Sequence, residues 1–307
     1  MASAELTFSL VPRRRLIGLA FGAMQSARRG TGSDVAGSRP YLPGDDVDAI
    51  DWAGSAKLSA ARGQDEFIVR ERYADEAPYV VCVCDRRPEM AHMGAHLPWL
   101  SKPAAMRVAL GLVESAVVNA RGFIGYLDFA SGDPYWAPPT SVRAAPALGG
   151  VDARRDEYRA PPRSIARALR HLTEHRRVLP AGSFVFLFSD FLEPLTVEDW
   201  LAASESRWDI VPVLIQDPVW EQSFPDVSGI AFPFADPRTG RTTHVRLTSA
   251  EVSERRERNE RRLQVLLDGL RDLAIEPILV SDDEPDRVLQ AFAGWTDQRL
   301  AETGRPR

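Results

Sequence analysis

Apolar strands that alternate with helical segments from about residue 78 onward are the feature that most constrains the fold of this chain. Residues 79–84 form a continuous apolar run rich in valine, the pattern of a strand with both faces buried. Further strand-like runs follow, separated by segments with helical periodicity, at residues 123–129, 183–188, 210–215 and 275–280. Repeated strand–helix units predict an α/β fold with a doubly wound, mostly parallel, Rossmann-like sheet.

One segment interrupts this alternation. Between residues 224 and 247, Asp236-Pro237-Arg238-Thr239-Gly240 separates two extended runs, which indicates a β-hairpin. We therefore expect a main domain over residues 78–302 with a hairpin insertion at about 224–247. The preceding residues, 1–77, are expected to form an N-terminal segment packed on that domain. Residues 135–137 have the composition of a short edge strand.

Charge and hydropathy narrow the classes of partner. The 38 basic and 43 acidic residues give a formal charge of −5, which favours neither nucleic acid nor an anionic membrane. The apolar stretch at residues 16–22 has about half the ~20 residues that a membrane span needs, and it indicates a short amphipathic helix instead. Cys82 and Cys84 lack metal-binding spacing and fit a buried pair in a reducing compartment. We expect a cytoplasmic protein without a membrane span.

Aspartates follow the predicted strands with unusual regularity. They lie at or just after the carboxyl end of each strand, at Asp85, Asp128, Asp190, Asp217 and Asp282. A single aspartate after a strand is ordinary turn chemistry. Several at one edge of an open α/β sheet, where ligands bind, suggest a site for a hard cation such as magnesium or calcium.

If these carboxylates converge, a positive group should lie between them, or one of them should be protonated. Two carboxylates about 4 Å apart repel by about 4 kcal/mol at an effective dielectric constant near 20. Arg87, two residues beyond Asp85, is a candidate, because a guanidinium can pair with Asp85 and Asp190 together. The alternative is that Arg86 and Arg87 lie on an exposed loop.

The sequence contains none of the common enzyme signatures. There is no G-x-S-x-G elbow, Walker loop, G-x-G-x-x-G fingerprint or H-E-x-x-H motif, so we expect no catalytic residues. The histidines form no obvious ligand set. His171 and His175 have metal-compatible i, i+4 spacing on a predicted helix, but without an accompanying Glu or Cys motif we expect no site there.

A dense motif precedes the first predicted strand of the main domain. It comprises Tyr41, Pro43, Gly44, Asp45 and Asp46 in Tyr-Leu-Pro-Gly-Asp-Asp, followed by Ile50-Asp51-Trp52 and Ser55-Ala56. This motif resembles the signature of the domain of unknown function 58 family, and the resemblance extends over roughly residues 30–300. On physical grounds, Asp45 and Asp46 favour the start of a short helix, and Trp52 is expected to anchor the N-terminal segment on the main domain.

The resemblance implies a von Willebrand factor A-like fold with a metal-ion-dependent adhesion site. Such a site uses a D-x-S-x-S loop, a threonine and a later aspartate. Here the loop is Asp85-Arg86-Arg87-Pro88-Glu89, so Arg87 and Glu89 replace both serines; Ser164 stands for the threonine and Asp190 for the aspartate. The binding residues implied are therefore Asp85, Arg87, Glu89, Ser164 and Asp190, in a degenerate site. We expect no cofactor, with magnesium on Asp85, Ser164 and Asp190 as the open alternative.

The resemblance also implies a function. Family members often act beside MoxR-type AAA ATPases, so we expect a non-enzymatic protein-interaction adaptor or chaperone-like partner that binds a protein, with such an ATPase as the candidate. The alternative, from another class, is a metal-dependent phosphohydrolase or nuclease that uses the strand-end aspartates. A purely structural subunit with an inert site is a third possibility.

Overall fold

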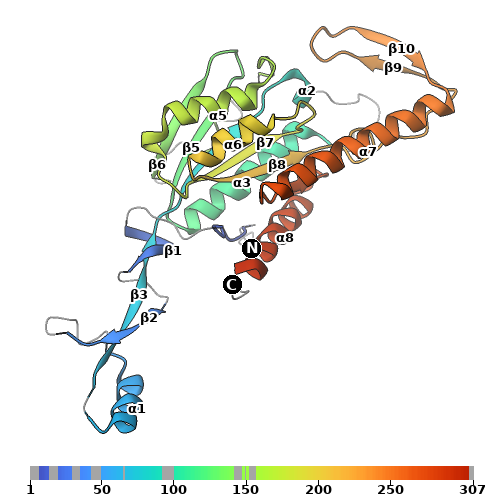
Figure 1. Ribbon diagram of the computed structural model, residues 1–307. Helices are drawn as coiled ribbons and strands as arrows, with labels where there is room; N and C mark the ends of the chain where they lie inside the picture. Colours follow the sequence, from blue (N-terminus) through green and yellow to red (C-terminus); the bar gives the residue numbers. More distant parts are fainter. Residues whose placement is uncertain are drawn as a thin grey trace, which may run out of the picture.

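The computed structural model describes residues 7–13, 20–29, 35–42, 50–64, 66–91, 100–141, 147–148, 150–151 and 157–303. A six-stranded sheet with the strand order β11-β8-β7-β4-β5-β6 forms its centre (Figure 1). Neighbouring strands are parallel except β5 and β6, which are antiparallel. The strands are β4 (Tyr79–Cys84), β5 (Phe123–Asp128), β6 (Tyr135–Ser141), β7 (Phe184–Ser189), β8 (Asp209–Ile215) and β11 (Ile278–Val280). The predicted mostly parallel α/β fold is confirmed, with β6 as its edge strand.

Helices cover both faces of this sheet, as the doubly wound prediction requires. One face packs against α3 (Lys102–Asn119) and α8 (Pro285–Thr303). The other packs against α5 (Ser164–Glu174), α6 (Val197–Glu205) and α7 (Ser249–Asp272). Two short helices, α2 (Pro88–Ala91) and the 3₁₀ helix η2 (Arg176–Val178), lie in the connections.

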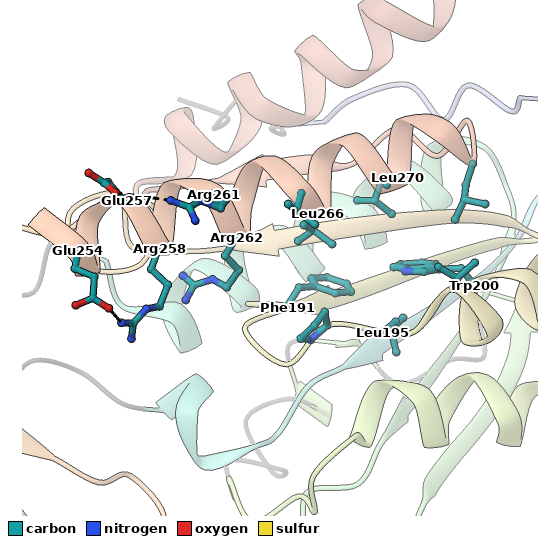
Figure 2. A pocket seen from close by; sticks show the side chains of 15 residues that line it. Phe191, Leu195, Trp200, Glu254, Glu257, Arg258, Arg261, Arg262, Leu266 and Leu270 are labelled. Atoms are coloured by element: carbon teal, nitrogen blue, oxygen red, sulfur yellow. Dashed lines mark hydrogen bonds and ion pairs between the residues drawn. The ribbon is translucent and has the colours of Figure 1, made fainter.

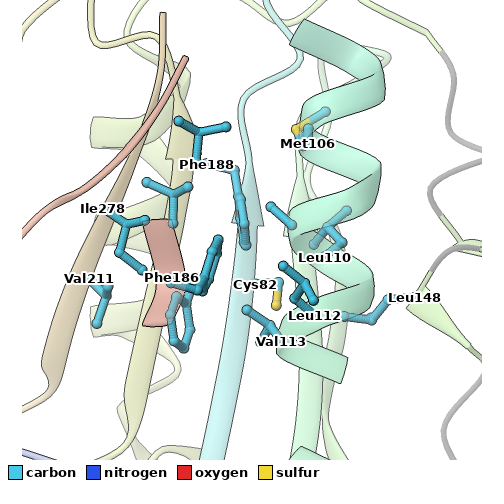
Figure 3. Close-up of a cluster of buried hydrophobic side chains, with 14 of the residues drawn as sticks. Cys82, Met106, Leu110, Leu112, Val113, Leu148, Phe186, Phe188, Val211 and Ile278 are labelled. Atoms are coloured by element: carbon cyan, nitrogen blue, oxygen red, sulfur yellow. The ribbon is translucent and has the colours of Figure 1, made fainter. Parts of the chain in front are cut away.

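Strand β4 shows why a continuous apolar sequence is needed at the centre. Successive side chains point to opposite faces of a strand. Cys82 and Cys84 therefore belong to the core beneath α3, whereas Val81 and Val83 belong to the core beneath α5. Figure 3 shows Cys82 among the side chains of α3 and β7. Both cysteines are buried and neither forms a disulfide bond, so they serve as small apolar core residues.

The hairpin insertion is confirmed. Strands β9 (Ala231–Ala235) and β10 (Thr242–Arg246) pair in antiparallel register and project from the main domain (Figure 1). The turn is closed by the Asp236 amide, which donates to the carbonyl of Arg241 at 2.9 Å. Helix α7 follows directly and begins with a capping box formed by Thr248 and Glu251.

A second, antiparallel sheet precedes the main domain. It has the order β1-β3-β2, formed by β1 (Ala20–Arg29), β2 (Val35–Pro40) and β3 (Ile68–Glu76), and α1 (Trp52–Arg62) lies between β2 and β3 in the chain. Figure 1 shows this sheet and α1 extending away from the central sheet. The amphipathic helix expected at residues 16–22 is wrong for residues 20–22, which lie in β1; residues 16–19 fall outside the described part.

Candidate functional site

The predicted site residues meet where the strand order reverses between β4 and β7. Connections from β4 and β7 run to opposite sides of the sheet, so the carboxyl ends of these strands border a crevice. Asp85 directly follows β4, Asp190 directly follows β7, and Ser164 is the first residue of α5. All three side chains are buried. The fold thus brings together the three side chains that the sequence named as candidate oxygen ligands for a metal ion.

Arg87 lies between the two aspartates. Its Nη2 is 2.7 Å from Asp85 Oδ2 and 2.8 Å from Asp190 Oδ1, and its Nε donates to Asp85 Oδ2 at 2.9 Å. Its side chain is only 4% exposed, which rules out the exposed-loop alternative. The guanidinium therefore supplies the positive charge that two converging carboxylates require.

A second cation, Lys102, approaches Asp190 from the first turn of α3. Its ammonium nitrogen is 2.9 Å from Asp190 Oδ2 and also pairs with Glu221. No motif in the sequence marks Lys102 as a site residue, so it was missed. One signal was available: a cation in the first helical turn opposes the helix dipole and calls for an acidic partner.

Ion pairing outweighs burial at the central groups. Burial alone would lower the pKa of Lys102, yet Asp190 and then Glu221 raise it above its ordinary value. Burial alone would raise the pKa of Asp190, but Lys102 and then Arg87 hold it below its ordinary value. Burial does raise the pKa of Glu221 in spite of Lys102. Asp190, whose pKa is lowered chiefly by Lys102 among the charged groups, is therefore the main partner of Lys102, and Glu221 is the weaker one.

Serine hydroxyls complete the surroundings of Asp85. Ser164 Oγ donates to Asp85 Oδ1 at 2.9 Å, and Ser189 Oγ donates to Asp85 Oδ2 at 2.6 Å. The Arg87 backbone amide also donates to Oδ1, at 3.0 Å. Ser189 is a further contributor that the sequence analysis left unassigned, although it belongs to the same Ser-Asp pair as Asp190.

These residues do not fit a magnesium ion. Magnesium requires carboxylate and hydroxyl lone pairs directed at one octahedral position. Here two serine O–H groups and the Arg87 guanidinium are directed at the oxygens of Asp85, and Lys102 is directed at Asp190. The carboxylate oxygens are therefore occupied by hydrogen bonds and ion pairs within the protein and are not directed at a metal position.

Glu89 is not part of this cluster. Its Oε1 pairs with Arg238 Nε of the β9–β10 hairpin at 2.6 Å. The second residue that replaces a serine of the adhesion-site loop therefore joins the insertion to α2, which the sequence could not indicate because 149 residues separate the partners.

The remaining strand-end aspartates have local structural roles. Asp128 accepts from Tyr126, which in turn accepts from the buried Arg86. Asp217 accepts from two backbone amides of the loop after β8, and Asp282 accepts from the Glu284 amide. For these three positions, the ordinary turn interpretation describes the structure better than the cation-site interpretation.

An apolar groove is a second feature of this side of the molecule (Figure 2). It has a volume of about 570 Å³ and lies between α7 and the segment that follows β7. Apolar side chains line one end: Phe191, Leu195, Trp200, Leu266 and Leu270. Phe191 directly follows Asp190 and has a left-handed backbone (φ 50°), which is strained for an aromatic residue. The groove is therefore one residue away from the ion-pair cluster.

Charged residues of α7 line the other end of the groove. Arg258 pairs with Glu254 at 2.6 Å and Arg261 with Glu257 at 3.7 Å. The neighbouring Arg262 donates from Nη2 to the carbonyl of Glu221, but its buried Nε has no hydrogen-bond partner among the described residues. Burial lowers the pKa of Arg262, although Glu221 and Asp190 oppose this. A free donor thus remains where the groove approaches the cluster.

The family signature lies partly in the described residues. Asp51 caps α1 by accepting from the Gly54 amide at 3.0 Å, and the buried Ser55 hydroxyl accepts from the Ile68 amide at 2.9 Å. Trp52 is 59% exposed and packs against Phe67, so its predicted anchoring role on the main domain is wrong. The Tyr41 amide donates to the Phe67 carbonyl at 2.8 Å. Residues Pro43, Gly44, Asp45 and Asp46 lie outside the described part of the chain.

Comparisons with known proteins agree with the signature. The model of the family described as "Protein of unknown function DUF58" matches residues 37–265. No curated protein matches this chain. In the part of the chain that the structure describes, no helix has the length and apolar character to cross a membrane.

Several solved structures are similar at low sequence identity. BatB from Bacteroides thetaiotaomicron is 15% identical, with 73% of this chain and 99% of that chain covered and a TM-score of 0.39. An aerotolerance-related membrane protein from Bacteroides fragilis is also 15% identical, with 72% and 99% covered and a TM-score of 0.36. The pilus adhesin SpaC from Lactobacillus rhamnosus GG is 10% identical, with 74% of this chain and 30% of that chain covered and a TM-score of 0.42.

Proposed function

Because this chain belongs to the family of proteins of unknown function DUF58, we propose that it is a non-enzymatic protein-interaction adaptor. The observation that carries the proposal is the position of Arg87, whose guanidinium is bound to both Asp85 and Asp190. In an adhesion-type site, a metal ion would bridge these carboxylates to a partner. Here an internal cation takes that place, so we propose that partner binding requires no divalent ion and that the site has no hydrolytic activity.

The surface best suited to a partner is the groove beside α7. Val265 and Val197 line it and are 66% and 61% exposed, which is unusual for large apolar side chains on an otherwise polar helix surface. A partner segment with apolar side chains would cover these residues. Its carboxylate would pair with the exposed guanidinium group of Arg258 or Arg261 at the charged end.

The proposed partner is a MoxR-type AAA ATPase, and the protein would act beside it in a chaperone-like role. This identification rests on the family resemblance alone. The groove adds the chemistry that such a partner must provide, which is an amphipathic segment with an acidic residue near its end.

Site-specific photo-crosslinking tests the proposal. A photoreactive amino acid at position 265 in the full chain should form adducts with one protein when native lysate is irradiated, and purified candidate ATPase should form the same adduct. Val118 on α3 is a matched control, because it is also an exposed valine, at 49%, on the opposite face of the sheet. Equal labelling from both positions, or none from position 265 with and without nucleotide, would reject the groove as the binding surface.

Direct measurements of affinity for the captured partner then test the apolar contact and the metal independence. Val265→Asp should weaken binding of the captured partner at least tenfold, whereas Val118→Asp should leave it unchanged. Chelation of divalent ions should also leave the affinity unchanged. A partner that dissociates when EDTA is added would contradict the proposed metal independence.

A further inference from the structure

A second group of potential ligands lies at the C-terminal end of α5, the opposite end of the helix from Ser164. His171, Glu174 and His175 each offer one ligand atom, and these atoms all lie within 4.8 Å of one another. The i, i+3, i+4 spacing places the three side chains on one face of the last helical turn. The spacing of the two histidines alone does not indicate a site, and Glu174, which lies between them in the chain, supplies the third ligand atom.

The two imidazole rings of this group lie against each other. Their rings stack with centroids 4.2 Å apart. His175 Nδ1 is 2.8 Å from the carbonyl of His171. Donation to this carbonyl fixes the tautomer and leaves the Nε2 lone pair free, which is the usual orientation device behind metal-ligating histidines.

An independent observation concerns His171. Its Nε2 is buried and has no hydrogen-bond partner among the described residues. A buried polar nitrogen without a partner costs free energy, so such an atom calls for an unseen ligand or water. The ring also packs edge-on against Trp136 of β6, with centroids 5.9 Å apart, which holds it in place.

On these grounds we propose that His171, Glu174 and His175 form a binding site for a borderline transition-metal cation, with zinc as the best fit. Zinc accepts imidazole nitrogen and carboxylate oxygen at about 2.0–2.2 Å. The ligand atoms must approach more closely than they do here, and the exposed side chain of Glu174 has room to turn toward the two imidazoles. Solvent or an exogenous ligand would complete the tetrahedron.

The surroundings select against hard cations. A pocket of about 320 Å³ beside the site is lined by Arg167 and Arg170 together with His171 and Glu174. Two guanidinium groups repel a cation that is held mainly by charge, such as magnesium or calcium. Coordination by imidazole overcomes this repulsion more readily, because it relies on nitrogen lone pairs.

Calorimetry on the full, tag-free chain tests the site with zinc chloride as the probe. One zinc ion per chain should bind with a micromolar or lower dissociation constant. Binding should weaken at least tenfold in His175→Ala, an exposed position whose change should not impair folding, and likewise in His171→Ala. His244→Ala on the exposed strand β10 is the matched control and should bind as the wild type does.

Cobalt(II) absorption provides a second measurement that does not depend on stability. A d–d spectrum of tetrahedral intensity should appear with one equivalent of cobalt and disappear in His175→Ala. The proposal is overturned if zinc binds with less than one ion per chain at saturation, or if the His171→Ala/His175→Ala double variant retains wild-type affinity. It stands apart from the adaptor function, since a failure here leaves the groove and its partner untouched.

Discussion

Arg87 binds Asp85, two positions before it in the chain, through its guanidinium, with Nη2 2.7 Å from Asp85 Oδ2. The same nitrogen reaches Asp190, which β7 brings from 103 residues away. A local and a distant carboxylate are thus joined by one side chain at the switch point of the sheet. Removal of this side chain should therefore affect the stability of the whole domain.

Arg87→Ser should lower the free energy of unfolding by about 3–5 kcal/mol, because it leaves Asp85 and Asp190 buried with part of their positive partner missing. Urea denaturation measures this change. Arg62→Ser is a suitable control: Arg62 is 63% exposed and pairs with Glu66 on the surface, so its loss should cost less than about 1 kcal/mol. Similar effects from both variants would show that the buried network contributes no more than a surface pair.

Affinity for magnesium at the strand-end site should appear only when the internal cation, the guanidinium of Arg87, is removed. Wild-type protein should show no magnesium or manganese binding at the strand-end site by calorimetry, because Arg87 and Lys102 are bound to its aspartates. Arg87→Ser with Glu89→Ser should restore weak affinity, and addition of Lys102→Ser should increase it further. Tight magnesium binding by the wild type that Asp85→Asn abolishes would overturn this assignment.

The depressed pKa of Asp190 implies a specific acid sensitivity. A carboxyl group whose pKa is lower in the folded state contributes stability above its unfolded pKa and loses it as pH falls through the folded value. Lys102 and Arg87 cause the depression, against burial. The wild type should therefore lose more stability between pH 5 and pH 2 than Asp190→Asn, although the variant is less stable at pH 7. Parallel pH profiles of the two free energies of unfolding would contradict this.

Much of the fold follows from local sequence patterns, whereas the site depends on long-range contacts. The apolar run of β4 and the capping box at Thr248 act within a few residues, so they could be predicted. Asp85 and Asp190 could also be placed, because parallel strands bring their carboxyl ends to one edge. Lys102 could not, since its partners depend on how α3 packs against the sheet.

The burial of Trp52 was predicted incorrectly. Trp52 is a large aromatic residue of the kind that anchors a core, yet it lies on a helix that projects from the main domain, packs against Phe67 and is 59% exposed. No periodicity in a single sequence distinguishes burial in a core from packing on a small satellite sheet. The groove beside α7 was equally hidden, because its shape arises from the position of a long helix beside the segment that follows β7 and not from any motif.

A final prediction concerns the N-terminal residues 7–13. Arg299 of α8 is buried, makes two hydrogen bonds to Asp209 at 2.7 and 2.9 Å, and donates to the carbonyl of Val11 at 2.9 Å. The Arg13 amide donates to the same aspartate at 3.0 Å. Arg299→Met should therefore loosen this segment as well as lower the free energy of unfolding by about 3–5 kcal/mol.

Limited trypsin digestion followed by mass spectrometry should show cleavage after Arg13 at least several-fold faster than in the wild type. Arg287→Met, an exposed position on the same helix, should leave the rate unchanged. Cleavage that is equally fast in all three proteins would mean that Arg299 does not hold the segment.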